Sequence, residues 1–219
     1  MKLLLTSSGL KNEYIVEALQ KLVEKSLAET SIVFVPTAAN PGTDDKSWVI
    51  ENLKDFQRCG FKSIDIIDVA LPDEVWKPHF LAADIICFGG GNEKYLARII
   101  EENKIKEFLV PLLNTKVYMG ISAGSMVAGH FLTEDLNSEL FPEEDYGSEH
   151  GLPIELYDFA FIPHLNSGWF KHLRREFINN IEKERFSTSV YVADDETAIK
   201  IDGSVIEVVG KGDYLIINK

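Results

Sequence analysis

Cysteine is scarce in this sequence, and it has no long hydrophobic run. Its two cysteines, Cys59 and Cys87, stand in unrelated contexts, which excludes a disulfide framework and a cysteine-based metal site. No apolar run approaches the roughly 18 residues of a membrane span. The apolar start, residues 1–5, is soon interrupted by Ser7-Ser8-Gly9 and is too short for a signal peptide. We therefore expect a soluble, cytoplasmic protein with no membrane among its partners.

Basic residues are outnumbered, with 22 Lys and Arg against 35 Asp and Glu and a net charge of −13. A field of this sign repels nucleic acid phosphates and anionic membrane surfaces, which excludes both as main partners. An acidic substrate would need a local basic pocket. The 219 residues, 45% of them hydrophobic, suffice for one domain with a buried core, which we place at residues 1–219.

Short β-rich runs alternate with stretches of helical spacing over the first 120 residues. The pattern predicts strands at 2–6, 31–35, 63–69, 84–88 and 116–119, and helices at 13–28, 46–58 and 93–103 between them. Such alternation is typical of βαβ units. It predicts an α/β fold with a mostly parallel sheet flanked by helices on both faces.

The C-terminal part has a different pattern. Apolar runs at 190–192, 198–201, 205–209 and 214–217 are separated by Asp202-Gly203 and Gly210-Lys211-Gly212, which are typical of hairpin turns. We therefore expect an antiparallel C-terminal extension. The acidic segment 133–153, which contains prolines and glycines, is expected to be a long loop.

Residues 120–124 read Gly-Ile-Ser-Ala-Gly, a match to G-x-S-x-G between an expected strand and an expected helix. A sharp strand-to-helix turn exposes the serine oxygen above the sheet edge, which makes Ser122 a candidate nucleophile. The N-terminus of the helix behind it would stabilise a negative oxygen through free N–H groups. The alternative is a glycine-flanked helix N-cap.

The run Gly89-Gly90-Gly91-Asn92 also connects an expected strand to an expected helix. Consecutive glycines let backbone N–H groups approach an anion. One use is an oxyanion hole completed by the N–H of Ala123. Another is phosphate binding, although neither G-x-G-x-x-G nor G-x-x-x-x-G-K-[ST] is present. The third is a tight turn in which Asn92 caps the next helix.

Among the five histidines, His164 stands at an expected strand end, directly after Phe161-Ile162-Pro163. Ligands of open α/β sheets bind at such edges. A serine nucleophile needs a base, and His164 is the candidate. A carboxylate should orient that base. Glu196 is favoured because it lies next to an expected strand, and Asp135, which lies near the start of the acidic segment, is the alternative.

Four motifs together resemble peptidase family S51, in order and spacing over most of the chain. They are Gly89-Gly90-Gly91-Asn92, Gly120-Ile121-Ser122-Ala123-Gly124-Ser125, Ile162-Pro163-His164 and Asp195-Glu196-Thr197-Ala198. The resemblance implies a fold like that of class I glutamine amidotransferases, with a serine in place of their cysteine. It implies Ser122 as the nucleophile, His164 as the base, and an oxyanion hole from Gly90, Gly91 and Ala123.

The resemblance also bears on the third catalytic residue and on the substrate. Glu196 matches the family's glutamate position, and Asp135 the aspartate sometimes proposed. The family's aspartyl dipeptidase branch, which the chain's length suits, uses no metal or cofactor and prefers an N-terminal aspartate in a small peptide. Its substrate arginine lies on a helix after the histidine. Arg175 fits that position best, although the stretch from His164 to Arg175 is shorter than usual in that branch.

The sequence therefore predicts a serine peptidase, monomeric or homodimeric, that cleaves dipeptides with an N-terminal aspartate, with Asn92 and Arg175 contacting the substrate. The alternatives are a cyanophycinase-like or other serine hydrolase of the same fold, and a binding domain that holds a phosphorylated ligand at 89–92. An ordinary α/β-hydrolase usually has its histidine near the chain end, whereas residues 173–219 contain none. A glutamine amidotransferase would need cysteine at position 122.

Overall fold

The computed structural model describes residues 1–43, 45–144, 147 and 149–218. Its strands are β1 (Lys2–Thr6), β2 (Ser31–Val35), β3 (Ser63–Ile66), β4 (Ile85–Phe88), β5 (Val117–Ile121), β6 (Ala160–Ile162), β7 (Val190–Ala193), β8 (Thr197–Asp202), β9 (Val205–Gly210) and β10 (Tyr214–Ile217). Its α-helices are α1 (Glu13–Val23), α2 (Ser47–Cys59), α3 (Asp73–Ala82), α4 (Glu93–Glu102), α5 (Ile105–Leu112), α6 (Ala123–Met126), α7 (Glu134–Leu140) and α8 (Arg175–Asn179). Short 3₁₀ helices lie at Leu27–Glu29, Thr37–Ala39 and Lys183–Arg185.

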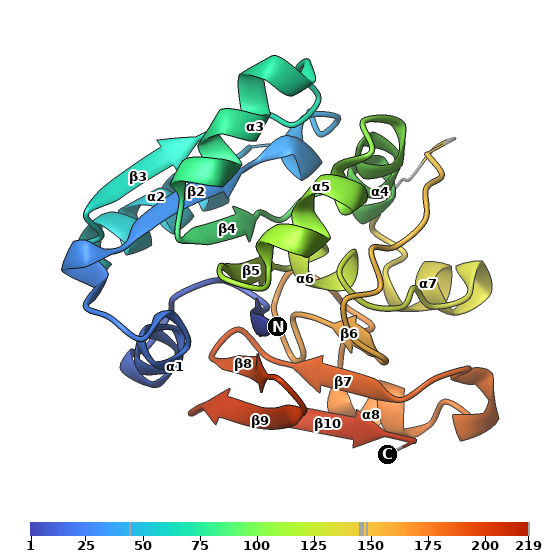
Figure 1. Cartoon of the computed structure of the whole chain (residues 1–219). Helices are drawn as coiled ribbons and strands as arrows, with labels where there is room; N and C mark the ends of the chain where they lie inside the picture. Colours follow the sequence, from blue (N-terminus) through green and yellow to red (C-terminus); the bar gives the residue numbers. More distant parts are fainter. Residues whose placement is uncertain (44, 145–146, 148, 219) are drawn as a thin grey trace.

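The main sheet has seven strands in the order β3-β2-β4-β5-β1-β8-β9 (Figure 1). The first five are parallel, and β8 and β9 add to β1 in antiparallel orientation. This confirms the predicted fold class, a mostly parallel α/β sheet with antiparallel strands at the C-terminus.

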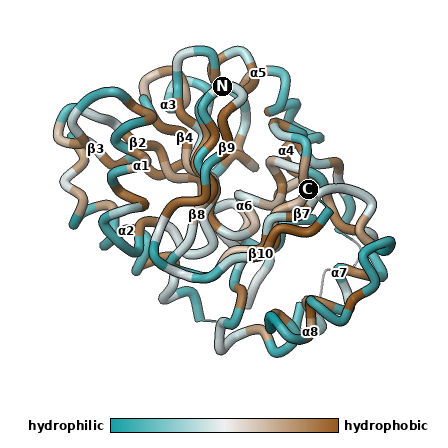
Figure 2. The backbone as a smooth tube through the Cα atoms, turned by 90° about the horizontal axis from the view of Figure 1, so that it is seen from below, coloured by the Kyte–Doolittle hydropathy of each residue, from teal (hydrophilic) through white to brown (hydrophobic). Residues whose placement is uncertain are grey.

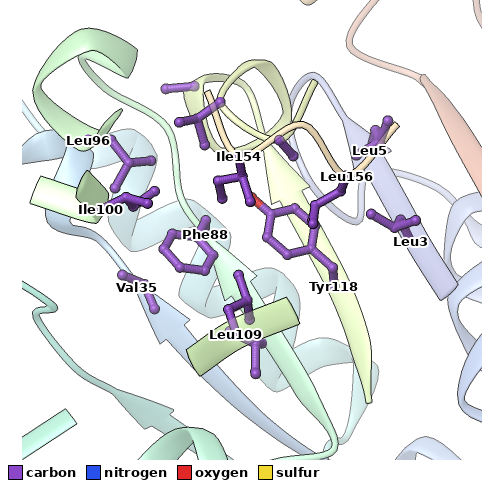
Figure 3. Packing of buried hydrophobic residues seen from close by; sticks show 14 of the residues in the cluster. Leu3, Leu5, Val35, Phe88, Leu96, Ile100, Leu109, Tyr118, Ile154 and Leu156 are labelled. Carbon is purple, nitrogen blue, oxygen red and sulfur yellow. The ribbon is translucent and has the colours of Figure 1, made fainter. Parts of the chain in front are cut away.

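Helices cover both faces of the main sheet. Alternate residues of each strand point to opposite faces, so each strand contributes side chains to both layers. Leu3 and Leu5 of β1 belong to the hydrophobic cluster that includes side chains of α3, α4 and α5, whereas Leu4 belongs to the cluster that includes side chains of α1 and α2. Figure 3 shows the first face, where the rings of Phe88 and Tyr118 stack with centroids 5.5 Å apart. Hydrophobic residues accordingly follow the strands, and hydrophilic residues gather in the outer turns (Figure 2). The buried strands form a rigid base for the loops at their carboxyl ends.

A second sheet of three strands, in the order β10-β7-β6, lies beside the main one (Figure 1). The predicted hairpin at Asp202-Gly203 joins β8 to β9, but the second predicted hairpin, at Gly210-Lys211-Gly212, is wrong. There the chain leaves the main sheet, and β10 pairs with β7. The turn is held by Asp194, whose carboxylate accepts a hydrogen bond from the Asp213 N–H at 2.6 Å.

Several predicted boundaries differ from the structure. The first helix ends at Val23, because Glu24 adopts a left-handed conformation that caps it. The third strand ends at Ile66. Segment 133–153, predicted as a loop, contains α7, which Thr133 caps through its side chain. Helices α3 and α5 each contain a proline, a residue that normally argues against a helix, and neither was predicted.

No helix among the described residues is long and apolar enough to cross a membrane.

Candidate active site

The carboxyl ends of five strands carry the candidate site. In the main sheet β5 lies between β4 and β1. Strand β4 leads into Gly89–Gly91, β5 leads into Ser122, and β1 leads into Ser7-Ser8. In the second sheet β6 leads into His164, and β7 leads into the turn 194–196. Loops at the carboxyl ends of parallel strands meet at one edge, where open α/β sheets bind ligands.

Ser122 has a strained backbone. Its φ of 50° and ψ of −112° lie in a region that residues with a Cβ rarely adopt. The conformation reverses the chain between β5 and α6, as a nucleophile elbow requires. Ser122 itself remains partly exposed.

The small residues of the motif are required by close packing. A Cβ on Gly124 would lie 2.0 Å from the carbonyl oxygen of Phe88, and a Cβ on Gly120 would lie 2.6 Å from the Ser125 Cα. Any side chain at either position would push the elbow away from β4 or open its turn. The Gly124 N–H donates to Gly89 O at 3.1 Å, which ties the elbow to the glycine loop.

His164 lies against the nucleophile. Ser122 Oγ donates to His164 Nε2 at 2.9 Å. The imidazole stacks on the ring of Phe170, with centroids 5.2 Å apart. Its side chain is only 15% exposed. The structure therefore brings together the predicted nucleophile and the predicted base.

Asp195 accepts a hydrogen bond from the other imidazole nitrogen. His164 Nδ1 donates to Asp195 Oδ1 at 2.7 Å, and Ser8 Oγ donates to the same oxygen, also at 2.7 Å. Partial burial opposes ionisation of Asp195, but the hydrogen bonds that its carboxylate accepts from His164 and Ser8 help to outweigh burial, and the net effect lowers the pKa of Asp195. The carboxylate can therefore hold the tautomer whose Nε2 is free to accept the serine proton.

Neither predicted carboxylate contacts the imidazole, and that prediction is wrong. Glu196 occupies the next position in the same turn and points elsewhere, with its nearest cationic partner, Lys211, at 3.8 Å. Asp135 lies in the first turn of α7, where Arg185 donates to it at 2.8 Å. The side chains of Ser122, His164 and Asp195 are instead hydrogen-bonded in series. Asp195 stood in the acidic cluster that the sequence pointed to, one position before the residue chosen.

Two serines after β1 complete the support of the triad, and the sequence reasoning missed both. The His164 N–H donates to Ser7 Oγ at 3.2 Å, and Ser7 Oγ donates to Ala193 O at 2.8 Å. Ser7 thus links the ends of β6 and β7, as Ser8 fixes Asp195. The available signal was their place directly after a buried parallel strand, the same signal that singled out His164.

The N–H groups proposed for an oxyanion hole lie beside the serine. A Cβ on Gly90 would be 3.3 Å from Ser122 Cβ. The N–H groups of Gly90, Gly91 and Ala123 donate to none of the described residues. Gly91 has a φ of +125° and lies against Ala38, so no other residue fits there. Because α6 has only 4 residues, these N–H groups, rather than a helix dipole, would meet a negative oxygen.

Asn92 caps α4 by accepting a hydrogen bond from the Tyr95 N–H at 2.8 Å, as the tight-turn alternative predicted. Its side-chain nitrogen has no partner among the described residues, so it remains available to a ligand.

Arg175 does not fit its predicted role. Its Nε donates to Asp213 Oδ2 at 3.0 Å, its Nη2 donates to Asp213 Oδ1, and the same Nη2 donates to Tyr214 O at 2.9 Å. The hydrogen bonds from Arg175 lower the pKa of Asp213. The Nε and Nη2 atoms of Arg175 are thus already engaged by Asp213. The expected helix after His164 begins only at Arg175, the first residue of α8, and the segment 163–174 is not helical.

Arg174 differs from its neighbour. Its Nη1 donates to the carbonyls of Ser167, Phe170 and Leu173, at 2.6, 3.1 and 3.3 Å. No carboxylate of the described residues pairs with it, whereas Arg58 and Arg175 each pair with one carboxylate and Arg98 and Arg185 each pair with two. The Arg174 guanidinium is therefore hydrogen-bonded to carbonyls of the loop that carries His164 and Phe170, and no carboxylate of the described residues balances its charge.

Within the described part of the chain, no three His, Cys, Asp or Glu side chains gather in a way that could hold a metal ion.

The fold and the site together define an α/β protein of the serine hydrolase type, with Ser122, His164 and Asp195 hydrogen-bonded in series at a strand-to-helix elbow. More narrowly, the chain belongs to peptidase family S51, whose model matches residues 3–209. The family resemblance stated from the sequence motifs is thereby confirmed.

Individual relatives agree with this membership. A peptidase E of Pasteurella multocida (strain Pm70) is 29% identical over 148 residues, a match that covers 63% of this chain and 58% of the relative. The matched region thus spans less than two thirds of that protein. A solved candidate peptidase E from Listeria monocytogenes EGD-e superposes with a TM-score of 0.77 at 20% identity, over 96% of this chain and 98% of the other. A peptidase from an acI-B1 Actinobacterium superposes with a TM-score of 0.63 at 21% identity, over 100% of this chain and 95% of the other. At these identities the two structures establish the fold.

Proposed function

We propose that this chain is a serine peptidase that hydrolyses short peptides by acyl transfer through Ser122. The observation that carries the proposal is the series of hydrogen bonds from Ser122 Oγ to His164 Nε2 and from His164 Nδ1 to Asp195. Membership of peptidase family S51 supports the same reaction class.

The reaction follows from this geometry. His164 Nε2 takes the proton as Ser122 Oγ attacks the scissile carbonyl carbon, and Asp195 stabilises the imidazolium that forms. The carbonyl oxygen becomes an oxyanion that the N–H groups of Gly90, Gly91 and Ala123 bind. His164 then returns the proton to the leaving amine as the C–N bond breaks. Water then attacks the acyl carbon while His164 Nε2 takes its proton, and the ester bond to Ser122 Oγ breaks as His164 returns that proton to the serine and the acid product leaves.

The test is Ser122→Ala assayed on a dipeptide panel. Turnover should fall by a factor on the order of 10⁶, the loss typical of dissected triads. Folding should persist, because one small hydroxyl at a turn is removed. A pure variant that retained more than a few per cent of the activity would rule the mechanism out. Covalent labelling of Ser122 by a fluorophosphonate, absent in Ser122→Ala, distinguishes a hydrolase from a binding domain.

The substrate proposed is a dipeptide with an N-terminal aspartate. Its side-chain carboxylate needs a cation in a chain of net charge −13. Since Arg175 is paired with Asp213, we assign this role to Arg174, which has no acidic partner among the described residues. Arginine can hold a carboxylate through two charge-assisted hydrogen bonds. Asn92, whose side-chain nitrogen is available beside the glycine loop, is proposed to contact the peptide.

Two variants test the substrate assignment. The wild-type protein should cleave Asp-Leu far faster than Asn-Leu, because a neutral isostere leaves the guanidinium unpaired. Arg174→Gln should lower the rate on Asp-Leu far more than the rate on Asn-Leu and so remove that preference, whereas Arg175→Gln should keep it. Equal wild-type rates on the two peptides would refute the aspartate preference, and its loss in Arg175→Gln would return the role to Arg175.

We further propose that the protein acts in the cytoplasm as a monomer or homodimer. The free thiols of Cys59 and Cys87 are compatible with a reducing compartment. Light scattering of the purified protein measures the oligomeric state, and fractionation of cells measures the location.

A further inference from the structure

An indole ring lies beside the candidate nucleophile. Trp48 is the second residue of α2, and 36% of its surface is exposed. The point where a Cβ on Gly90 would stand lies 3.3 Å from Ser122 Cβ and 3.5 Å from Trp48 Cζ3. The serine side chain and the edge of the indole therefore border the same small volume above the glycine loop.

Packing does not account for this position. The buried Trp76 contacts Phe80 and Phe108 edge-on, with centroids 5.1 and 5.4 Å away. Trp48 belongs to none of the three buried clusters and has no aromatic or cationic partner among the described residues. An exposed tryptophan leaves a large apolar surface in water, and burial of that surface by a ligand is favourable.

We propose that Trp48 forms the apolar wall of the subsite for the side chain of the C-terminal residue of the dipeptide. The inference rests on the proposed function. If the N-terminal side chain is acidic, the apolar side chain that an indole can bind belongs to the residue after the scissile bond. The preferred substrates are then Asp-Xaa dipeptides in which Xaa is leucine or phenylalanine. Trp48 is thus a specificity residue and takes no part in proton transfer.

The first test compares kcat/KM for Asp-Gly, Asp-Ala, Asp-Leu and Asp-Phe. In the wild-type protein the values should rise with the size of the apolar side chain. Trp48→Ala should lower the values for Asp-Leu and Asp-Phe about tenfold or more and that for Asp-Gly less than about twofold, the range expected when a side chain loses an apolar pocket. Trp48→Phe should recover most of the loss. Tyr14→Ala, which removes an exposed aromatic on α1, is the matched control and should leave the series unchanged.

The second test does not depend on a peptide substrate. Benzyl acetate and ethyl acetate both transfer an acetyl group to an activated serine, and the alcohol leaves on the side of the residue after the scissile bond. Chromatography of the released alcohol measures the rate for each reagent. The wild-type protein should react faster with the aromatic reagent, and Trp48→Ala should lose that difference. Thermal melting confirms that the variants are folded.

The outcomes distinguish the two proposals. If Asp-Xaa dipeptides are cleaved and the effect of Trp48→Ala is the same for every Xaa, the subsite is overturned and the peptidase assignment stands. If no dipeptide is cleaved but the wild-type protein prefers the aromatic reagent through Trp48, the peptidase proposal fails and the apolar subsite stands. Equal reaction of wild-type and Trp48→Ala proteins with both reagents also overturns the subsite.

Discussion

Neighbouring residues of one turn have different partners in this site. The Thr197 N–H donates to Asp194 O at 3.3 Å, which closes a turn with Asp195 and Glu196 at its centre. Within it the Asp195 carboxylate meets His164, whereas Glu196 lies 3.8 Å from Lys211. Successive positions of a tight turn direct their side chains differently, so two adjacent acids are not interchangeable. The position in the turn, rather than the acidity, selects the triad member.

The first prediction compares these two acids. Asp195→Asn should lower turnover about 10⁴-fold, because an amide favours the wrong imidazole tautomer and cannot stabilise the imidazolium. Glu196→Gln should leave turnover close to that of the wild-type protein. Steady-state kinetics on one dipeptide substrate measures both. A larger loss in Glu196→Gln than in Asp195→Asn would remove Asp195 from the triad.

The second prediction concerns Ser8, which supports the triad through Asp195. Ser8→Ala removes one hydrogen bond to the carboxylate, and such bonds to charged groups contribute roughly 1.5–3 kcal/mol. Turnover should therefore fall roughly ten- to a hundredfold, far less than in Asp195→Asn. KM should change little, since Ser8 is not assigned to substrate binding. A rise in KM with unchanged kcat would contradict a positioning role.

At the scale of elements, the elbow depends on how closely β5, α6 and β4 approach one another. The carbonyls of Gly124 and Ser125 accept hydrogen bonds from two buried hydroxyls, those of Tyr118 at 2.6 Å and Tyr157 at 2.5 Å. These contacts hold a helix that is too short to be stable alone. The strained conformation of Ser122 is therefore maintained by its surroundings.

The third prediction tests this packing. Gly124→Ala places a Cβ 2.0 Å from the Phe88 carbonyl oxygen, and the backbone must shift to admit it. We expect a loss of about 3 kcal/mol in the free energy of unfolding, or a fall in Tm of roughly 6–12 °C for a chain of this size. The loss of turnover should exceed what unfolding explains. Gly168→Ala, which meets nothing within 4 Å, is the control for stability. Equal melting of the two variants would contradict the model of a tightly packed elbow.

At the scale of the whole molecule, the C-terminal strands connect the two sheets. Strand β9 pairs with β8 in the main sheet, and β10 pairs with β7 in the second. Asp213, between them, binds Arg175 and accepts a hydrogen bond from Asn166 at 3.3 Å. The end of the chain thus holds the loop that follows His164.

The fourth prediction is the pH dependence of stability that this contact causes. The pKa values of Asp213 and Asp195 are lowered in the folded state. Their contribution to stability is present above the unfolded value of about 3.9 and is lost as the pH falls through the lower folded values. Tm should therefore fall below about pH 4, and Asp213→Asn should flatten that fall. Because Asp213 is partly exposed, its share should shrink in high salt.

Asp202→Asn serves as the control for this prediction. Asp202 is exposed at the β8–β9 turn, and its side chain has no partner among the described residues. Its replacement should leave the slope of Tm against pH unchanged. A slope that Asp213→Asn does not alter would show that the Arg175–Asp213 pair adds nothing to acid stability.

Sequence reasoning was accurate for local patterns. Strands β2, β4 and β5 follow from short apolar runs that meet a proline or a glycine, and the elbow follows from Gly-Ile-Ser-Ala-Gly after such a run. The same rule placed His164 at a strand end. It was inaccurate where packing overrides local preference, as in the proline-containing helices α3 and α5.

By itself the sequence determined the α/β fold class, the family, and the identities of the candidate nucleophile and base. These depend on patterns within a few residues, which the periodicity of helices and strands and the chemistry of turns dictate. Only the tertiary structure decided that Asp195 rather than Glu196 meets His164, 31 positions away, and that Arg175 pairs with Asp213, 38 positions away. The direction of a side chain in a turn, and the strand that packs against it, depend on how distant segments come together, which a local pattern does not encode.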